Sequence, residues 1–175
     1  SAFVAAGYPF SDRADLSRTG LVLPAAPDTA TLTTALDLMA RIGAASGYPA
    51  LGVEVSLGVD GLHRLRDRDL LAVLPMAAPA FSRLLRGGAF VRDDGELRLH
   101  PPTAIERLRR LVLGDWFLEH EQAAIALAGQ RQPRVLMSMP SPLNADRWQV
   151  LVAAEESAQL PAMADALGDS DITSR

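Results

Sequence analysis

The chain has 175 residues, 49% hydrophobic and 22% charged, a composition typical of one globular domain rather than of a disordered segment. The formal net charge is −4, which argues against a broad nucleic-acid-binding surface. All 17 basic residues are arginine and cysteine is absent, so lysine Schiff bases, disulfides and thiolate metal sites are excluded.

The first half of the chain alternates apolar runs with a helical pattern. A short buried strand is predicted at 21–23, and further strands are predicted at 52–56 and 69–74. Between the first two, a helix is expected to begin near Asp28 and to end at Gly47, a glycine suited to a helix C-terminus. Its expected buried stripe is Leu32, Leu36, Met39 and Gly43, widened by Ala35, Leu38 and Ile42.

The second half of the chain continues the alternation of helices and strands. Over the whole length this favours a mostly parallel sheet with helices on both faces. The expected elements are a short helix at 79–86, a hairpin at 89–99, a long helical stretch at 101–127, strands at 134–139 and 149–153 joined by a loop at 140–146, and a final helix at 155–167.

The segment after the first strand is the first place to look for a ligand, because open parallel sheets bind ligands beyond the carboxyl ends of their strands. Residues 24–29 read Pro-Ala-Ala-Pro-Asp-Thr, without glycine and with two prolines that cannot donate hydrogen bonds. Several threonines follow and could imitate a phosphate loop, but Asp28 or Thr29 is more simply the N-cap of the helix. We therefore expect no FMN or other cofactor.

Other short motifs predict no catalytic or metal site. Asp67-Arg68-Asp69 spells the Asp-x-Asp of many glycosyltransferases, but it precedes its strand and so predicts a turn at the amino end of the sheet. The three histidines are scattered, and no serine lies in a Gly-x-Ser-x-Gly elbow. We expect no enzyme activity.

Two further patterns raise binding hypotheses. The run 15–20 fits the Asp-x-Ser-x-x-Gly half of a PilZ-type cyclic di-GMP site, and Arg64 with Arg68 fits its Arg-x-x-x-Arg half, although in reversed order. Two solvated turns explain both halves more simply. Separately, Trp148, with Tyr8 and Tyr48, could stack on a sugar or contact a partner.

Several strings spread along the chain resemble the B subunit of bacterial cellulose synthase. They are densest in the first 75 residues and looser across 75–132, where the reason for the divergence is not evident. The strings are Ala6–Ser11, Ala14–Ser17, Leu21–Pro24, Leu38–Ala44, Ser46–Ala50, Asp67–Leu71, Ser141-Pro142 with Asn144, and Leu160–Leu167.

The resemblance implies an α/β, flavodoxin-like three-layer sandwich with a mostly parallel sheet, the second such domain of a longer periplasmic protein anchored in the bacterial inner membrane. Residues 1–19 would then be a lead-in segment from a preceding domain, and residues 20–175 the flavodoxin-like domain. The chain's Ser1 start agrees with a piece of something longer.

The resemblance also implies a scaffolding role in cellulose biosynthesis. The domain would support the membrane glycosyltransferase, the A subunit, by packing against it or against other domains or copies of the B subunit. Candidate contact residues for a partner or for β-1,4-glucan are Trp148, Tyr8, Tyr48, Arg64 and Arg68. The alternatives are a glucan-binding module that contacts the emerging exopolysaccharide and a cyclic di-GMP-binding regulatory domain.

Overall fold

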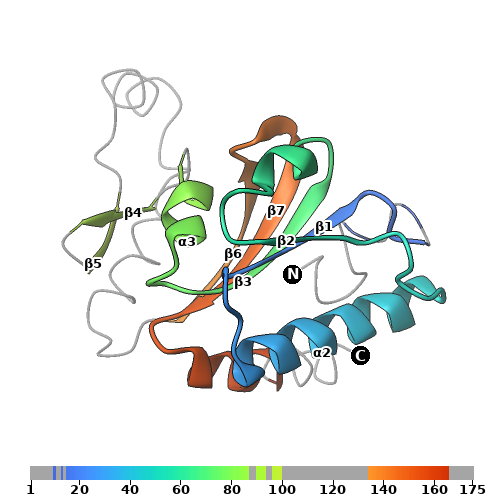
Figure 1. Ribbon diagram of the computed structural model, residues 1–175, viewed down its shortest axis with the longest axis horizontal. Coiled ribbons are helices and arrows are strands. Elements are labelled where there is room, and N and C mark those ends of the chain that lie inside the picture. The colour runs from blue at the N-terminus through green and yellow to red at the C-terminus, as the bar shows by residue number, and fades with distance from the viewer. Residues whose placement is uncertain are drawn as a thin grey trace, which may run out of the picture.

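The computed structural model describes residues 10, 13, 15–86, 90–93, 96–99 and 134–165. In this part of the chain a five-stranded sheet has the order β2-β1-β3-β7-β6 (Figure 1). Three of its four strand pairs are parallel, which confirms the prediction of a mostly parallel sheet. The strands are β1 (Thr19–Leu23), β2 (Glu54–Leu57), β3 (Asp69–Pro75), β6 (Arg134–Ser141) and β7 (Asn144–Ala154).

The last two strands form an antiparallel hairpin, so the loop expected at 140–146 is wrong. β6 continues to Ser141, β7 begins at Asn144, and only Pro142 and Leu143 turn between them. The Ser141 hydroxyl accepts the backbone N–H of Leu143 at 3.2 Å, which stabilises the tight turn. Proline, asparagine and aspartate suggest a loop, but here they lie at the end of a twisted hairpin at the sheet edge, where such residues are tolerated.

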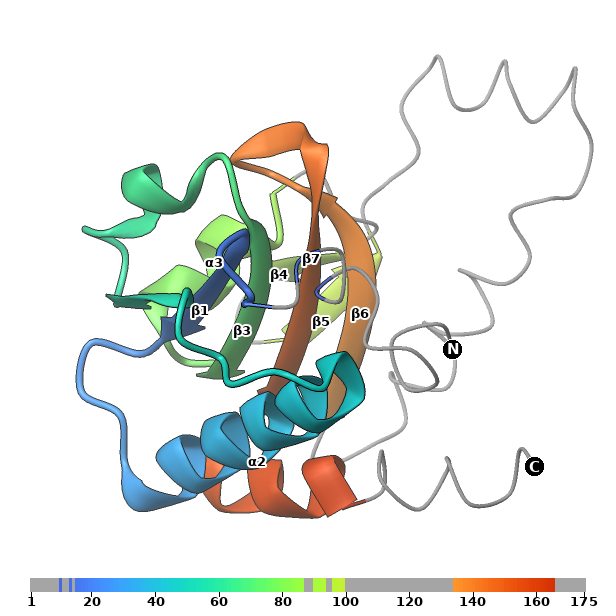
Figure 2. The same ribbon diagram turned by 90° about the vertical axis from the view of Figure 1, so that its right-hand side faces the viewer.

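Helices cover both faces of the sheet and make three layers. On one face lie α2 (Thr29–Ser46) and the helical residues 160–165, which follow the 3₁₀ turn η3 (Ser157–Gln159) (Figure 2). On the other face lie the 3₁₀ helix η2 (Leu62–Leu65) and α3 (Pro79–Leu84). The layers and the sheet confirm the flavodoxin-like prediction.

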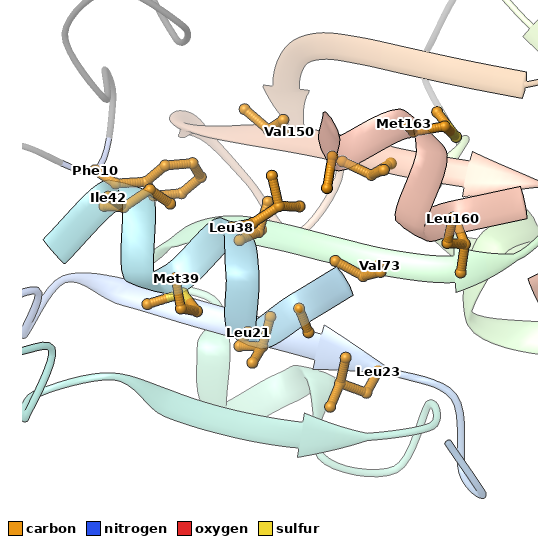
Figure 3. Packing of buried hydrophobic residues seen from close by; sticks show 14 of the residues in the cluster. Phe10, Leu21, Leu23, Leu38, Met39, Ile42, Val73, Val150, Leu160 and Met163 are labelled. Carbon is orange, nitrogen blue, oxygen red and sulfur yellow. The ribbon is translucent and has the colours of Figure 1, made fainter. Parts of the chain in front are cut away.

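Two apolar cores fill the spaces between these layers, because neighbouring residues of a strand point to opposite faces. On the α2 side, Leu21, Leu71 and Val150 lie side by side across three strands. In Figure 3, Phe10 lies beside Ile42 of α2, so residue 10 contributes to this core. On the other side, Leu70 and Leu151 pack with α3 and η2.

The ends of α2 agree with the sequence, but its buried stripe is shifted. Asp28 is the N-cap, and Gly47 follows the helix with a left-handed φ of 70°. The expectation that Leu32 and Leu36 are buried is wrong, since both are exposed. The buried side is centred instead on Ala35, Leu38 and Ile42, with Thr31 and Thr34 beside them.

The remaining expectations concern the middle and the end of the chain. The predicted hairpin is confirmed as β4 (Phe90–Asp93) and β5 (Glu96–Leu99), which pair antiparallel. The long helical stretch predicted at 101–127 and the last residues of the final helix lie outside the described residues.

Candidate functional site

The carboxyl edge of the sheet, where this fold usually binds ligands, is occupied by a side chain of the protein itself. Asp28 precedes α2, and its carboxylate accepts the backbone N–H of Thr31 at 2.8 Å. The hydroxyl of Ser157, which follows β7, donates to the other carboxylate oxygen. The hydrogen bond from Ser157, with that from Thr31, holds the pKa of Asp28 below its usual value.

This arrangement leaves a negative charge where a phosphate would otherwise bind. A helix N-terminus attracts anions through its free N–H groups and its dipole, and a fixed carboxylate competes for both. The threonines of α2 do not form a phosphate loop either, because Thr34 donates to the Ala30 carbonyl at 2.8 Å and Thr31 is buried. At the carboxyl edge of the sheet, the N-terminus of α2 is therefore capped by the protein's own Asp28 carboxylate.

The amino edge of the sheet is held together by Arg68, immediately before β3. Its guanidinium lies 3.0 Å from the Glu54 carboxylate, which belongs to β2. It also donates to the carbonyl of Gly52 at 3.3 Å and to the carbonyl of Ser17. One arginine thus joins the segments that enter three neighbouring strands.

The segment that enters β1 is a tight turn packed against the domain. Leu16 is fully buried although its φ is 55°, a left-handed conformation that non-glycine residues rarely adopt. Its N–H bonds the Arg13 carbonyl at 2.9 Å, and the Gly52 N–H bonds the Asp15 carbonyl at 2.9 Å. The Ser17 N–H donates to the Asp15 carboxylate at 3.0 Å and holds its pKa below the usual value.

One arginine of the PilZ-like pattern, Arg68, therefore contacts the run 15–20, in an interaction that holds the fold together. Arg68 donates to the Ser17 carbonyl, so this part of the pattern is not simply a solvated turn. The guanidinium that a phosphate would need is already engaged by Glu54.

The Asp-x-Asp triplet lies at the amino edge, as its position before a strand predicts. Asp69 is buried, and its carboxylate accepts the backbone N–H of Trp148 at 2.9 Å. Asp67 is exposed, and its carboxylate lies 3.9 Å from the Arg66 guanidinium. The two carboxylates have different surroundings, and Asp69 joins β3 to β7.

Two of the five predicted contact residues, Arg68 and Trp148, lie beside Asp69. Arg68 directly precedes Asp69 in the chain, and Trp148, within β7, donates its backbone N–H to the Asp69 carboxylate. Trp148 is 39% exposed, and Tyr48, just after α2, is 57% exposed. Arg64 is exposed on η2, which packs on the opposite face of the sheet from Trp148. Tyr8 lies outside the described residues.

Sequence reasoning missed an apolar surface that runs from α2 to β2, which we call the α2–β2 patch. It contains six of the eight large hydrophobic side chains that are exposed in the described part of the chain. A helical pattern does not show which flank of an apolar stripe lies beyond the sheet, so these leucines were assigned to the core. The patch consists of Leu32, Leu36, Tyr48, Leu51, Val55 and Leu57, with exposures between 40% and 83%.

Neither a metal-binding cluster of His, Asp or Glu side chains nor a membrane-spanning helix occurs in the described part of the chain. No cluster of three or more His, Asp or Glu side chains there could hold a metal ion. No helix in that part of the chain is both long and apolar enough to cross a membrane.

The layers and the strand order define the protein as a flavodoxin-like α/β domain. Its sequence places it further: residues 1–152 match the family described as "Cellulose synthase BcsB, second FD domain", and the chain belongs to that family.

Curated relatives are much longer than this chain. A "Cyclic di-GMP-binding protein" of Xanthomonas axonopodis pv. citri is 32% identical over 173 residues, 97% of this chain and 22% of the relative. A "Cellulose synthase 2" of Novacetimonas hansenii is 30% identical over 171 residues, 91% of this chain and 10% of the relative. A "Cellulose synthase 1" of Komagataeibacter xylinus is 40% identical over 93 residues, 53% of this chain and 6% of the relative.

Proposed function

We propose that this chain is a non-catalytic periplasmic domain of a cellulose synthase B subunit that supports the membrane glycosyltransferase subunit in cellulose synthesis and translocation. Family membership supplies the setting, since relatives are named cellulose synthases. The observation that carries the non-catalytic assignment is Asp28, whose carboxylate occupies the helix end at which this fold would hold an anionic cofactor or substrate. The support acts through packing surfaces that help to hold the assembly together.

The test is a reconstitution of the membrane subunit with the longer B polypeptide, measuring glucan made from UDP-glucose and co-purification of the two chains. One sample lacks residues 20–168, and another carries exposed-surface substitutions that leave the core intact, Tyr48→Ala with Arg64→Ala. Loss of both synthesis and co-purification in the deleted sample supports an assembly surface. Loss of synthesis with the complex intact would mean that the domain tunes catalysis or translocation by the membrane subunit rather than serving as an assembly surface.

The substitution sample separates a surface effect from unfolding. Synthesis could be lost in the deleted sample but unchanged in the doubly substituted one. That result would show that the docking surface lies elsewhere on the domain. Unchanged synthesis after the deletion would contradict the supporting role as a whole.

A second candidate function is contact with the glucan itself, favoured by the exposure of Trp148 and Tyr48. Tryptophan faces stack on sugar rings through their apolar surface. If the domain binds glucan, cellohexaose should change the tryptophan fluorescence and give a heat of binding in titration calorimetry. Trp148→Ala should remove both signals. An unchanged spectrum at millimolar cellohexaose would exclude it.

Cyclic di-GMP is a third candidate ligand, because three relatives are named cyclic di-GMP-binding proteins. Its support in this chain is weaker, because Arg68 is bonded to Glu54 and to two carbonyl groups. A periplasmic domain would also not meet a cytosolic messenger.

A further inference from the structure

Two methionines, Met137 and Met139, lie on one face of β6 with a single residue between them. β6 is an end strand of the five-stranded sheet (Figure 2). Alternate residues of a strand point to the same side of a sheet, so both side chains project to the α3 side, where Met137 packs against the core. Both side chains remain partly exposed. Neighbouring positions on one face of β6 thus carry two thioether sulfurs that solvent can reach.

The spacing of the two methionines allows their sulfur atoms to bind one ion. Residues i and i+2 of a strand are about 7 Å apart along its axis. Methionine has three rotatable side-chain bonds, so two Sδ atoms from such positions can converge on one point. Thioether sulfur is a soft ligand that selects Cu(I) over hard cations. It differs from histidine and carboxylate ligands, which form no cluster of three in the part of the chain that the structure describes.

Gln149 of β7 places an unpartnered oxygen atom beside these methionines. In the register of the sheet it is paired with Met139 on one side and with Leu70 on the other. Its side chain is fully buried, and its amide Nε2 donates to the Leu84 carbonyl at 2.7 Å. This hydrogen bond fixes which end of the amide is the oxygen. The Oε1 atom has no hydrogen-bond partner among the described residues.

A buried amide oxygen without a donor is costly, and such an atom in a folded protein calls for a partner such as an ion. The side chains of Leu70 and Met139 have no N–H or O–H group to offer it. A cation held by the two sulfurs would have Gln149 Oε1 within reach as a third ligand. These three ligand atoms carry no formal charge, so they suit a monovalent ion better than a divalent one, whose charge they would leave uncompensated.

We propose that Met137, Met139 and the Gln149 side-chain oxygen form a binding site for a soft monovalent metal ion of the Cu(I) class. The site goes beyond the proposed function and does not depend on it, because no partner of the chain takes part in binding the ion.

Silver is the probe for this site, because Ag(I) shares the ligand preference of Cu(I) and needs no reductant. The 175-residue chain, labelled with ¹³C at its methionine methyl groups, is titrated with silver nitrate in a chloride-free buffer and followed by NMR. We expect the methyl signals of Met137 and Met139 to shift together and to saturate at one Ag(I) per chain. Met39 and Met163, which are buried in the α2-side core, should not move. No shift at a tenfold excess of Ag(I), or a shift of only one of the two methionines, overturns the proposal.

Substitutions make the test specific to the three ligands. Met137→Leu and Met139→Leu each remove one sulfur and nearly conserve volume, so the melting midpoint without silver should be close to that of the wild type. Each should weaken Ag(I) binding at least tenfold, whereas Met163→Leu, the matched control, should leave it unchanged. Gln149→Leu should weaken it at least threefold. Equal weakening by Met163→Leu would overturn the site, and full affinity in a folded Gln149→Leu chain would overturn the three-ligand arrangement.

The pH dependence separates this site from binding by histidine. Neither a thioether nor an amide titrates between pH 5 and pH 7, whereas histidine gains a proton there, so the affinity for Ag(I) should change by less than about threefold over that range. Loss of the two methyl shifts at pH 5 would show that an imidazole holds the ion, and would also overturn the proposal.

Discussion

The Asp28 carboxylate links two segments that are far apart in the sequence, and its protonation should be visible in the stability of the domain. Hydrogen bonds from Ser157 and Thr31 lower its pKa in the folded state below the ordinary value of 3.8. The charged form therefore adds stability that is fully present well above pH 3.8 and is lost as the pH falls through the lowered pKa. Asp28→Asn retains an N-cap but not this charge, so its urea midpoint should fall below that of the wild type at pH 7, and the gap should narrow near pH 3. A gap that is the same at both pH values would contradict the role of the charge.

Arg68 should be the most sensitive arginine in the described part of the domain. Arg68→Ala removes donors from the carbonyls of Ser17 and Gly52 and leaves Glu54 without its partner. Because the guanidinium is partly buried, we expect a loss of about 1–3 kcal/mol in the free energy of unfolding, measured with urea. Arg68→Lys should restore only part of the lost free energy of unfolding, since an ammonium group cannot reproduce the several planar donors of the guanidinium. Arg64→Ala is the control and should stay within about 0.5 kcal/mol; equal losses at both positions would argue against the clamp.

At the scale of elements, the connection between α2 and β2 is restricted by its contact with the entering segment. A methyl group at Gly52 would lie 2.7 Å from the Cα of Ser17 and 2.8 Å from the Asp15 carbonyl oxygen, so backbone must move. Gly52→Ala should therefore destabilise the domain by about 1–3 kcal/mol. Gly43→Ala is the matched control inside α2, where the added Cβ meets its nearest atom at 3.4 Å and helix propensity favours alanine. Calorimetric melting of both variants gives the comparison, and a tolerated Gly52→Ala would show that the contact is loose.

Most strands and both ends of α2 were predictable because each rests on local chemistry. The continuous apolar run of β3 predicts a strand buried on both faces, and Asp28 and Gly47 are typical helix-capping residues. The β6–β7 turn and the exposure of Leu36 depend on what lies beside them in space, which no local pattern contains. The contacts of the candidate site were still harder to predict from the sequence. Arg68, for example, contacts Gly52 and Ser17, which are 16 and 51 positions away.

At the scale of the whole molecule, the domain boundary predicted between residues 19 and 20 remains open to a direct test. Phe10 and Leu16 are buried in the α2-side core, and the Arg18 carbonyl accepts the N–H of Asp69 at 2.8 Å. A chain that begins at residue 20 would lose both apolar side chains from that core, so we expect a lower urea midpoint and more binding of a hydrophobic dye than in the 175-residue chain. Leu16→Ala in the intact chain isolates one contribution and should remove about 2–5 kcal/mol, the range for buried leucine. If the shortened chain and Leu16→Ala both unfold at the wild-type midpoint, the entering segment is a dispensable connector and the predicted boundary stands; if both fall, the cooperative unit begins before β1.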